Sequence, residues 1–387
     1  MHEDQPPIPF NRSAIEGNEL EYIKTAMENG HTSSGGEFAK RAAATLIAET
    51  GAKEVLLTTS CTSALELTAL MLDVGPADTV IVPSFTFTTT ALAFARQGAK
   101  IKFCDIEPTT LGLDPRHLGE LLDDSVRAVV PVHYAGVACD MEGLRKALAE
   151  RPDVAVIEDN AHGLFGRWHG QPLGTLGRFA TQSFHDTKNI VCGEGGALLV
   201  NEERDVDRAR VLYDKGTNRR AFFLGQVDKY SWKDTGSSFG LSDALAAYLC
   251  AQLERRHVIQ DKRRVVYERY EQALAPMADE LGIRLPVVPD YCEQTYHMFY
   301  LLLPDRPTRD AVLSGMREQG VIATFHYVPL HSSEAGRKFS AAPAECPVTD
   351  DISGRLIRLP FYNNLTTAES ERVVETFVET LRAVRAG

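Results

Sequence analysis

The stretch Val154-Ala155-Val156-Ile157-Glu158-Asp159 is an apolar run that ends in two acids. Runs of this kind predict strands that are buried on both faces of a sheet. Similar runs lie on either side of it, at Glu54–Leu57, Thr79–Val82, Lys100–Cys104, Ala128–Val132, Ala180–Phe184 and Ala197–Val200. Helical patterns such as Met141–Leu148 separate many of them. This alternation predicts an α/β fold with a mainly parallel sheet covered by helices on both faces.

A lysine and an aspartate stand at the ends of two of these runs. Lys188 precedes the glycine-rich turn Gly193–Gly196, where the backbone can approach a flat ligand closely. A lysine becomes a Schiff-base former when its surroundings disfavour the charged ammonium. Asp159 comes earlier in the chain, as pyridoxal phosphate requires: the acid keeps the ring nitrogen protonated and the lysine holds the aldehyde. Either residue alone is more often a surface charge, so the hypothesis depends on other segments as well.

Two earlier segments offer a place for a phosphate and for a flat ring. Thr58–Leu65 opens a helical pattern, and a helix N-terminus with hydroxyl side chains attracts anions. The alternative is simple capping of that helix by Ser60 or Thr62. Phe85 follows the next strand-like run and is a candidate for stacking on a heterocycle, although an aromatic there is more often core. Ligands bind such sheets beyond the carboxyl ends of the strands, where these residues fall.

The chain resembles the DegT/DnrJ/StrS family of sugar-nucleotide aminotransferases from Ile8 to the C-terminal helix. The segments that carry the resemblance are Ser60–Thr62, Pro131–Cys139, Ser183–His185, Lys215–Arg219, Gly225–Tyr230 and Phe325–His331. Within the family they look closest to enzymes that aminate dTDP-4-keto-6-deoxy-D-glucose at C4. The resemblance implies a fold-type-I transferase that binds pyridoxal phosphate. Its mainly parallel seven-stranded sheet would lie between helices, with a smaller α+β domain at the C-terminus.

The resemblance also assigns roles to individual residues. It makes Lys188 the lysine that carries the cofactor and Asp159 the partner of the ring nitrogen, and both are predicted to be catalytic. His162 falls beside the 3-hydroxyl of the cofactor, and Phe85 falls in the stacking position. The side chains implied at the phosphate are Thr62, Ser63 and Ser183.

In one respect the sequence departs from the family pattern. Many members carry an asparagine that reaches the phosphate from the partner subunit, in the segment that reads Gly236–Asp243 here. Because this segment has no asparagine, we expect Ser238 or its neighbour Ser237 to replace it. The family also implies a homodimer with active sites at the subunit interface.

A net charge of −12 opposes an anionic substrate, so a nucleotide diphosphate needs a local cationic pocket. Basic residues that would form one are Lys215, Arg219, Arg220 and Lys229, with a solvated charged loop as the alternative. The residues predicted to bind the substrate are Lys215, Asn218, Arg219 and Tyr327. For Tyr327, as for His133 and His331, packing in the core or at an interface is the alternative. The same negative charge argues against nucleic acid as a partner.

The length of 387 residues, with 44% apolar and 24% charged residues, is typical of a globular protein with two domains. We predict a large cofactor-binding domain at residues 1–255 and a small domain at 256–387. A helical pattern without Gly or Pro, Ser242–Leu274, connects the two. The elements predicted in the small domain are strands at Phe299–Leu303 and Ile322–His326 and helices near Arg309–Gln319 and Ala368–Val384.

The sequence gives no sign of a membrane span or of secretion. No apolar run approaches the roughly 20 residues of a membrane-spanning helix. Met1–Pro6 is acidic and lacks the basic and apolar regions of a signal peptide. Seven cysteines without a C-x-x-C pair argue against a disulfide framework and against a zinc site. We therefore expect a cytoplasmic protein without a bound metal.

The predicted reaction moves the amino group of L-glutamate to C4 of dTDP-4-keto-6-deoxy-D-glucose and gives a dTDP-4-amino-4,6-dideoxy-hexose. A relative that dehydrates sugars has histidine at the position of Lys188, so lysine favours amino transfer. One alternative is the same chemistry at C3 or on another keto sugar nucleotide. Another is a non-catalytic regulator, which would be expected to have lost Lys188 or Asp159. A nicotinamide enzyme would carry G-x-G-x-x-G after an early strand, where this chain has Thr59–Thr62.

Overall fold

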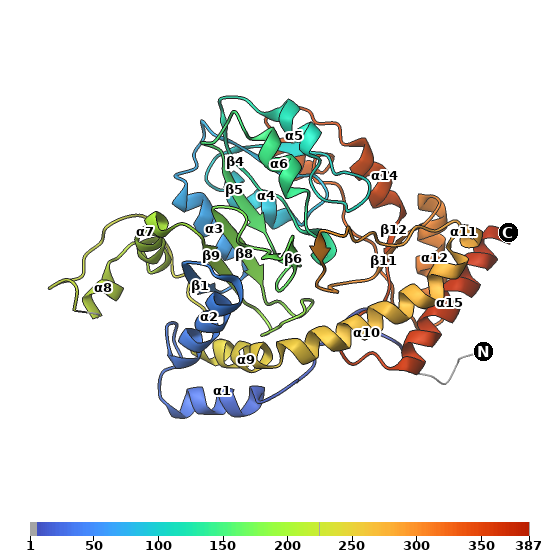
Figure 1. Cartoon of the computed structure of the whole chain (residues 1–387), viewed down its shortest axis with the longest axis horizontal. Coiled ribbons are helices and arrows are strands. Elements are labelled where there is room, and N and C mark those ends of the chain that lie inside the picture. Colours follow the sequence, from blue (N-terminus) through green and yellow to red (C-terminus); the bar gives the residue numbers. More distant parts are fainter. Residues whose placement is uncertain (1–5, 224, 387) are drawn as a thin grey trace.

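The computed structural model describes residues 6–223 and 225–386. At its centre lies a seven-stranded sheet with the strand order β1-β9-β8-β5-β4-β2-β3 (Figure 1). Its strands are β1 (Glu54–Thr58), β2 (Thr79–Pro83), β3 (Lys100–Cys104), β4 (Val126–Val129), β5 (Ala155–Asp159), β8 (Phe179–Ser183) and β9 (Gly196–Val200). Neighbouring strands run parallel except at β9, which is antiparallel to both β1 and β8. The predicted α/β fold with a mainly parallel sheet is confirmed.

Helices cover both faces of the sheet because side chains alternate along each buried strand. The covering helices are α2 (Glu37–Thr50), α3 (Cys61–Met71), α4 (Thr88–Ala95), α5 (Pro115–Leu121), α6 (Met141–Ala147), α7 (Glu203–Tyr213) and α9 (Asp243–Glu254). On β2, Val80 and Val82 pack with α3 and α4 on one face, while Ile81 packs with α5 and α6 on the other. Over β1, β8 and β9, α2 and α9 cover that second face.

The helical pattern from Ser242 to Leu274 forms two consecutive helices rather than one. α9 ends at Glu254, and α10 (Arg256–Leu274) begins after Arg255, whose φ of −98° and ψ of 7° interrupt the helix. In Figure 1, α10 continues from α9 towards the C-terminal part of the molecule. The predicted domain boundary between residues 255 and 256 falls at this interruption, and the division into domains stays a prediction.

The C-terminal elements surround a second hydrophobic cluster. They include β11 (Tyr300–Leu302), β12 (Leu356–Arg358), α12 (Arg306–Glu318) and α15 (Thr367–Ala386), so one predicted strand and both predicted helices are present. The strand predicted at Ile322–His326 is wrong. Only Thr324 exchanges backbone hydrogen bonds with Arg358. The next carbonyl, that of Phe325, accepts a hydrogen bond from the Arg358 guanidinium at 3.1 Å, so the ladder does not continue.

The remaining elements are α1 (Glu19–Glu28), η1 (Tyr134–Gly136), β6 (Arg167–Trp168), β7 (Gln171–Pro172), α8 (Arg219–Phe223), η2 (Ala275–Met277), α11 (Ala278–Leu281), β10 (Cys292–Glu293), α13 (Glu334–Phe339) and α14 (Pro347–Arg355). Figure 1 shows α8 standing away from the body beyond α7. We call residues 214–238 the arm.

None of the described helices is both long and apolar enough to cross a membrane. The prediction about a signal peptide concerns residues 1–6, of which 1–5 lie outside the described residues.

Candidate active site

A cavity of about 490 Å³ opens at the carboxyl ends of β5 and β8. The predicted site residues that line it are Thr62, Asp159, His162, Ser183, Lys188 and Tyr327. These side chains come from the first turn of α3, from β5 and β8 and the loops after them, and from the C-terminal part of the chain. The structure thus brings together the acid, the lysine and the phosphate segment, as expected for the carboxyl edge of a parallel sheet.

Asp159 ends β5 and is 6% exposed. Its carboxylate accepts hydrogen bonds from Thr90 Oγ1 at 2.8 Å and from the backbone N–H of Ala161 at 3.3 Å. Burial raises the pKa of this carboxyl, while the two hydrogen bonds act in the opposite direction. A protonated group of a ligand in the cavity would therefore gain strongly from lying beside Asp159.

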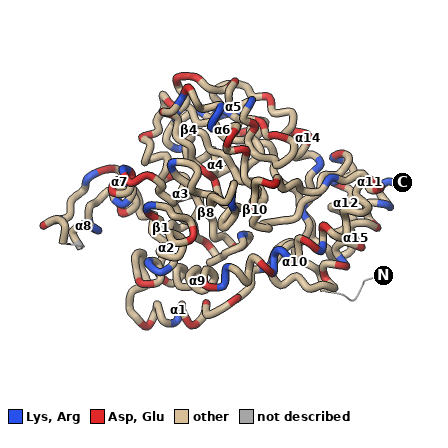
Figure 2. The backbone as a smooth tube through the Cα atoms, in the orientation of Figure 1, with Lys and Arg blue, Asp and Glu red and all other residues tan. Residues whose placement is uncertain are grey.

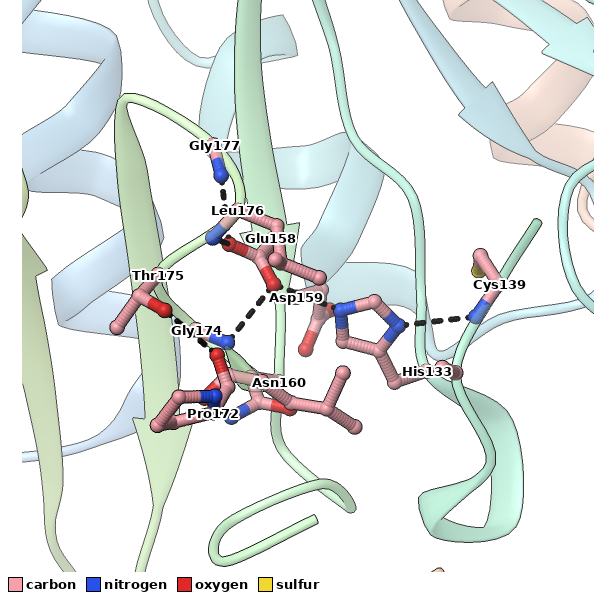
Figure 3. A network of polar contacts seen from close by, with 12 residues as sticks. His133, Cys139, Glu158, Asp159, Asn160, Pro172, Gly174, Thr175, Leu176 and Gly177 are labelled. Atoms are coloured by element: carbon pink, nitrogen blue, oxygen red, sulfur yellow. Dashed lines mark hydrogen bonds and ion pairs between the residues drawn. The ribbon is translucent and has the colours of Figure 1, made fainter. Parts of the chain in front are cut away.

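Glu158, the other acid at the end of β5, has a structural role (Figure 3). Its carboxylate accepts hydrogen bonds from three backbone N–H groups of residues 174–177 at 2.7–2.8 Å. It also accepts one from His133 Nε2 at 2.9 Å. The backbone N–H of Cys139 donates to His133 Nδ1 at 3.1 Å, so the ring carries its proton on Nε2. This network fixes β5 behind Asp159, and the packing interpretation of His133 holds.

Lys188 lies in the loop between β8 and β9. Burial lowers the pKa of its amine to about 8, against the opposing effects of Cys61 and Asp159. An amine with this pKa is neutral to a substantial extent near pH 8, and only the neutral amine is a nucleophile. The lysine that the sequence singles out therefore has the electrostatic setting that covalent chemistry requires.

The N-terminus of α3 faces the cavity through Ser60, Cys61 and Thr62. Ser60 Oγ accepts a hydrogen bond from the backbone N–H of Ser63 at 3.1 Å, so helix capping and an anion site coexist here. The expectation for the Ser63 side chain needs a correction. Ser63 is not among the lining residues, and its hydroxyl lies 2.9 Å from Thr59 Oγ1 instead.

The expectation that Phe85 stacks on the cofactor also needs a correction. It is 1% exposed, does not line the cavity, and packs its ring against Tyr134 and Tyr327 at centroid distances of 5.1 and 5.5 Å. Phe87 lines the cavity instead and is 57% exposed. β2 ends at Pro83 and the chain bends before α4, so strand alternation does not predict which aromatic faces the ligand. The ring available for stacking is that of Phe87.

The other predicted residues lie on the arm and do not line the cavity of their own chain. Lys215 and Arg219 form ion pairs with Asp214 at 3.0 and 3.2 Å. Asn218 Oδ1 accepts a hydrogen bond from the backbone N–H of Ser231 at 2.7 Å. Ser238 is exposed and pairs with Asp214 through the backbone.

Arg358 at the end of β12 is a cavity residue that sequence reasoning missed. Its guanidinium lies over the Phe10 ring, 4.6 Å from the centroid, and burial lowers its pKa. Among the described residues it has no acidic partner, and its Nε atom is buried without a hydrogen bond. The sequence signal for it is its place inside the apolar run Leu356–Pro360, because a charged side chain is rare in a buried strand and often has a functional role there. His326 and His297 line the same cavity and were also missed.

A family model described as the DegT/DnrJ/EryC1/StrS aminotransferase family matches residues 13–378. The chain belongs to this family. Membership confirms the resemblance seen in the sequence and makes the protein an aminotransferase of a family that uses pyridoxal phosphate.

Solved structures of other proteins have the same fold. The aminotransferase TlmJ from Streptoalloteichus hindustanus is 28% identical, with a TM-score of 0.89 over 98% of this chain and 100% of that chain. The structure of 3-amino-5-hydroxybenzoic acid synthase is 25% identical, with a TM-score of 0.87 over 97% of this chain and 100% of that one. Spr1654 from Streptococcus pneumoniae in its PLP form shares the fold at 23% identity, with a TM-score of 0.89 over 98% and 99% of the two chains.

The residues of the cavity fit the cofactor of this family. Asp159 offers a buried carboxylate to a protonated ring nitrogen, and Lys188 offers an amine that is easily neutralised. In the first turn of α3 the backbone N–H groups of Cys61 and Thr62 have no acceptor among the described residues and are available to a phosphate. The hydroxyls of Thr62 and Ser183 line the same cavity. Within the described part of the chain, no group of three or more His, Cys, Asp or Glu side chains is placed to hold a metal ion.

Proposed function

We propose that this protein transfers the amino group of L-glutamate to C4 of dTDP-4-keto-6-deoxy-D-glucose, with pyridoxal phosphate as cofactor. The product is a dTDP-4-amino-4,6-dideoxy-hexose. The observation that carries the chemistry is the single cavity shared by Lys188, Asp159 and the N-terminus of α3. The choice of acceptor is supported by the segments that resemble C4 enzymes, above all Pro131–Cys139 and Phe325–His331.

The chain's own residues bind the cofactor and move protons. Lys188 would hold the cofactor through its aldehyde, and its amine would be free once the amino donor has taken that place. As a free amine, Lys188 would act as a general base and acid that moves a proton between the α-carbon of the donor and the cofactor carbon on the other side of the transferred nitrogen. Asp159 holds the proton on the ring nitrogen, because a buried carboxylate stabilises an adjacent positive charge. When bound, pyridoxal phosphate supplies an electron sink for the pair of electrons released at that carbon.

Arg358 supports an amino acid as the donor. A guanidinium that is buried without an acidic partner gains most from a ligand carboxylate, which it can hold with two parallel hydrogen bonds. The phosphate has a separate place at the N-terminus of α3, so Arg358 remains for the carboxylate of the donor. A keto sugar lacks that carboxylate, and its diphosphate needs other cations.

The arm is the part of the molecule that would supply those cations, from a second subunit. Figure 2 shows basic residues along it, and Lys215, Arg219 and Lys229 belong to it. Its aromatic side chains are exposed to an unusual degree, with Trp232 at 82% and Tyr230 at 57%. A homodimer in which each arm covers the cavity of the partner would bury these rings. It would also bring the basic residues and Ser238 to the substrate.

All seven cysteines carry free thiols. This supports a reducing compartment, for which we propose the cytoplasm.

The test is the near-ultraviolet and visible spectrum of the purified protein with pyridoxal phosphate. L-glutamate should bleach the absorbance band of the bound cofactor, and dTDP-4-keto-6-deoxy-D-glucose should then restore it. Bleaching without restoration would leave the aminotransferase in place and shift the acceptor to another keto sugar nucleotide or to amination at C3. The absence of any band, even with added cofactor, would reject Lys188 as the reactive lysine and favour a non-catalytic regulator.

A further inference from the structure

The segment before α1 contributes two residues to the wall of the cavity. Phe10 and Asn11 line it, although they lie far in sequence from the other lining residues. The backbone of Ile8 fixes this segment: its N–H donates to the carbonyl of Gly320 at 2.8 Å, and its carbonyl accepts from the N–H of Ile322 at 3.0 Å. Ile8 is also 2% exposed and belongs to the C-terminal hydrophobic cluster. The segment is therefore held firmly against the C-terminal part of the chain.

The ring of Phe10 lies against the one arginine in the described cavity wall. The guanidinium of Arg358 is over this ring, 4.6 Å from its centroid. The carbonyl of Phe10 accepts a hydrogen bond at 3.0 Å from the N–H of Phe361, three residues after Arg358, so the ring and the guanidinium are tied to the same short stretch of chain. An aromatic face attracts a cation and occupies none of the N–H groups of a guanidinium, which point outward in its plane.

Most of the N–H groups of Arg358 have no acceptor in the described protein. Nη2 donates to the carbonyl of Phe325 at 3.1 Å. Nε is buried without a partner, and Nη1 has no partner among the described residues and is not sealed off from the cavity. The Phe325 carbonyl and the Phe10 ring thus fix the guanidinium at one edge and on one face. The remaining N–H groups can be satisfied by a carboxylate, whose two oxygens match the geometry of the guanidinium.

We propose that Phe10 is a positioning residue of the amino-donor site, whose ring holds Arg358 in the orientation in which the guanidinium binds the donor carboxylate. This role rests on the proposed function for the identity of the donor. It gives a reason for a half-buried aromatic residue from the N-terminal segment in the cavity wall. The alternative is plain packing, for which any apolar side chain of similar size would serve.

The next residue, Asn11, contacts the loop of the reactive lysine instead. Its Nδ2 donates to the carbonyl of Asp186 at 2.9 Å, and Asp186 lies two residues before Lys188. The N-terminal segment thus reaches the Lys188 loop through the side chain of Asn11 and the arginine through the ring of Phe10. A change confined to that ring should alter the binding of the donor and leave the proton transfer by Lys188 as fast as before.

Two substitutions separate positioning from packing. Phe10→Leu removes the aromatic face and keeps an apolar side chain of similar size, whereas Phe10→Tyr keeps the aromatic face. Phe339→Leu on α13 is the matched control, because Phe339 is also half-buried and has the Lys338 ammonium 5.3 Å from its ring centroid. Neither Phe339 nor Lys338 lines the cavity, so this change should have no effect on either ligand.

The experiment measures donor binding in two ways on the protein loaded with pyridoxal phosphate. Calorimetry gives the dissociation constant of glutarate, which has both carboxylates of glutamate and no amino group to react. Stopped-flow absorbance gives the L-glutamate concentration at half-maximal rate of bleaching and the limiting rate. We expect Phe10→Leu to raise the glutarate dissociation constant and the half-saturating glutamate concentration by about tenfold, the effect of one desolvated cation–π contact, with the limiting rate unchanged. Phe10→Tyr should restore most of the loss.

A double substitution tests whether Phe10 acts through Arg358. Arg358→Gln should itself weaken the binding of both ligands, and Phe10→Leu added to it should cause no further loss. The role of Phe10 would be overturned by unchanged glutarate binding in Phe10→Leu, by an equal loss in Phe10→Tyr, or by a loss that persists without the arginine. It would also be overturned if the unchanged protein did not bind glutarate. If glutarate binding follows the expected order but glutamate does not bleach the band, the positioning role stands and the proposed donor is wrong.

Discussion

Burial shifts the pKa values of Lys188 and Asp159 in opposite directions, and both shifts disfavour the charged form. Burial lowers the pKa of the amine and raises that of the carboxyl, so both groups are pushed towards their neutral forms. A ligand that bonds to the neutral amine and places a positive charge beside the carboxylate removes the cost of burying both charged groups. In the proposed arrangement pyridoxal phosphate would do so with its aldehyde and its ring nitrogen, which agrees with the position of both residues in one cavity.

The pKa of Lys188 predicts how cofactor capture depends on pH. The amine is shifted to about 8 from its usual 10.5, so its reactive neutral form increases as the pH rises to 8 and changes little above. The rate at which the apo-protein develops the cofactor band should rise by about tenfold per pH unit below pH 8 and then level off. Stopped-flow absorbance measures this rate. A plateau reached only near pH 10.5 would mean that the amine is not buried as described.

Lys188→Ala should abolish turnover, since Lys188 is the only lysine among the described residues that line the cavity. The cofactor should still bind, but dialysis should remove it, because only non-covalent contacts remain. Lys24→Ala, at an exposed lysine on α1, is the control and should retain full activity. Turnover close to that of the unchanged protein in Lys188→Ala would rule out the assignment.

At the scale of single residues, the sequence predicted which side chains lie at or just after the ends of strands. Asp159 and Lys188 could be found because apolar runs mark where strands end. Phe87 and Arg358 could not be placed, because a bend after β2 and a bridge beside β12 decide which side chain turns into the cavity. The expectation for Ser63 failed because its hydroxyl bonds to Thr59, which precedes α3, and does not line the cavity.

Among the elements, the contact between β9 and α3 determines the phosphate end of the cavity. A Cβ on Gly196 would lie 2.4 Å from the backbone nitrogen of Cys61, so only glycine allows β9 to approach the first turn of α3. Gly196→Ala should lower the free energy of unfolding by about 1–3 kcal/mol, as overpacking does, and weaken cofactor binding.

Chemical denaturation and cofactor titration measure the two effects of Gly196→Ala. Gly119→Ala on α5 is the control, because nothing lies within 4 Å of its added Cβ. That change should be neutral or slightly stabilising in a helix. A Gly196→Ala protein with unchanged stability and affinity would show that the first turn of α3 is not tightly held.

Every strand of the central sheet could be predicted, because each is a short apolar run between turns. The predicted bounds of the strands differ from the observed ones in places. For example, β4 spans Val126–Val129, whereas the pattern predicted Ala128–Val132. The failure at Ile322–His326 has another cause. The β-branched and aromatic residues of this segment favour a strand, but a strand also needs a neighbouring strand to pair with. Here the carbonyl of Phe325 accepts a hydrogen bond from the Arg358 guanidinium and not from a backbone N–H of a neighbouring strand.

For the whole molecule, the arm predicts an active site assembled from two subunits. A protein with Lys188→Ala should be inactive, and one with Lys215→Ala and Arg219→Ala should bind the dTDP-sugar poorly. Mixed dimers of the two should regain part of the activity, because one cavity then combines an intact lysine with an intact arm. Activity assays on co-expressed, differently tagged subunits measure this. No gain in verified mixed dimers would mean that each arm serves its own subunit or none.

The antiparallel strand β9 has a consequence for motion as well. It turns the Lys188 segment into a hairpin loop whose two ends are paired in register, Ser183 with Gly196, and whose base is closed by bonds from Phe184 N to Gly195 O and from Cys192 N to Phe184 O. The base of this loop cannot open unless the sheet around it opens too. In hydrogen–deuterium exchange the amides of Phe184 and Cys192 should therefore be as slow as those of β5. The loop that carries Lys188 would thus have one of the slowest-exchanging bases in the protein, although loops usually exchange fast.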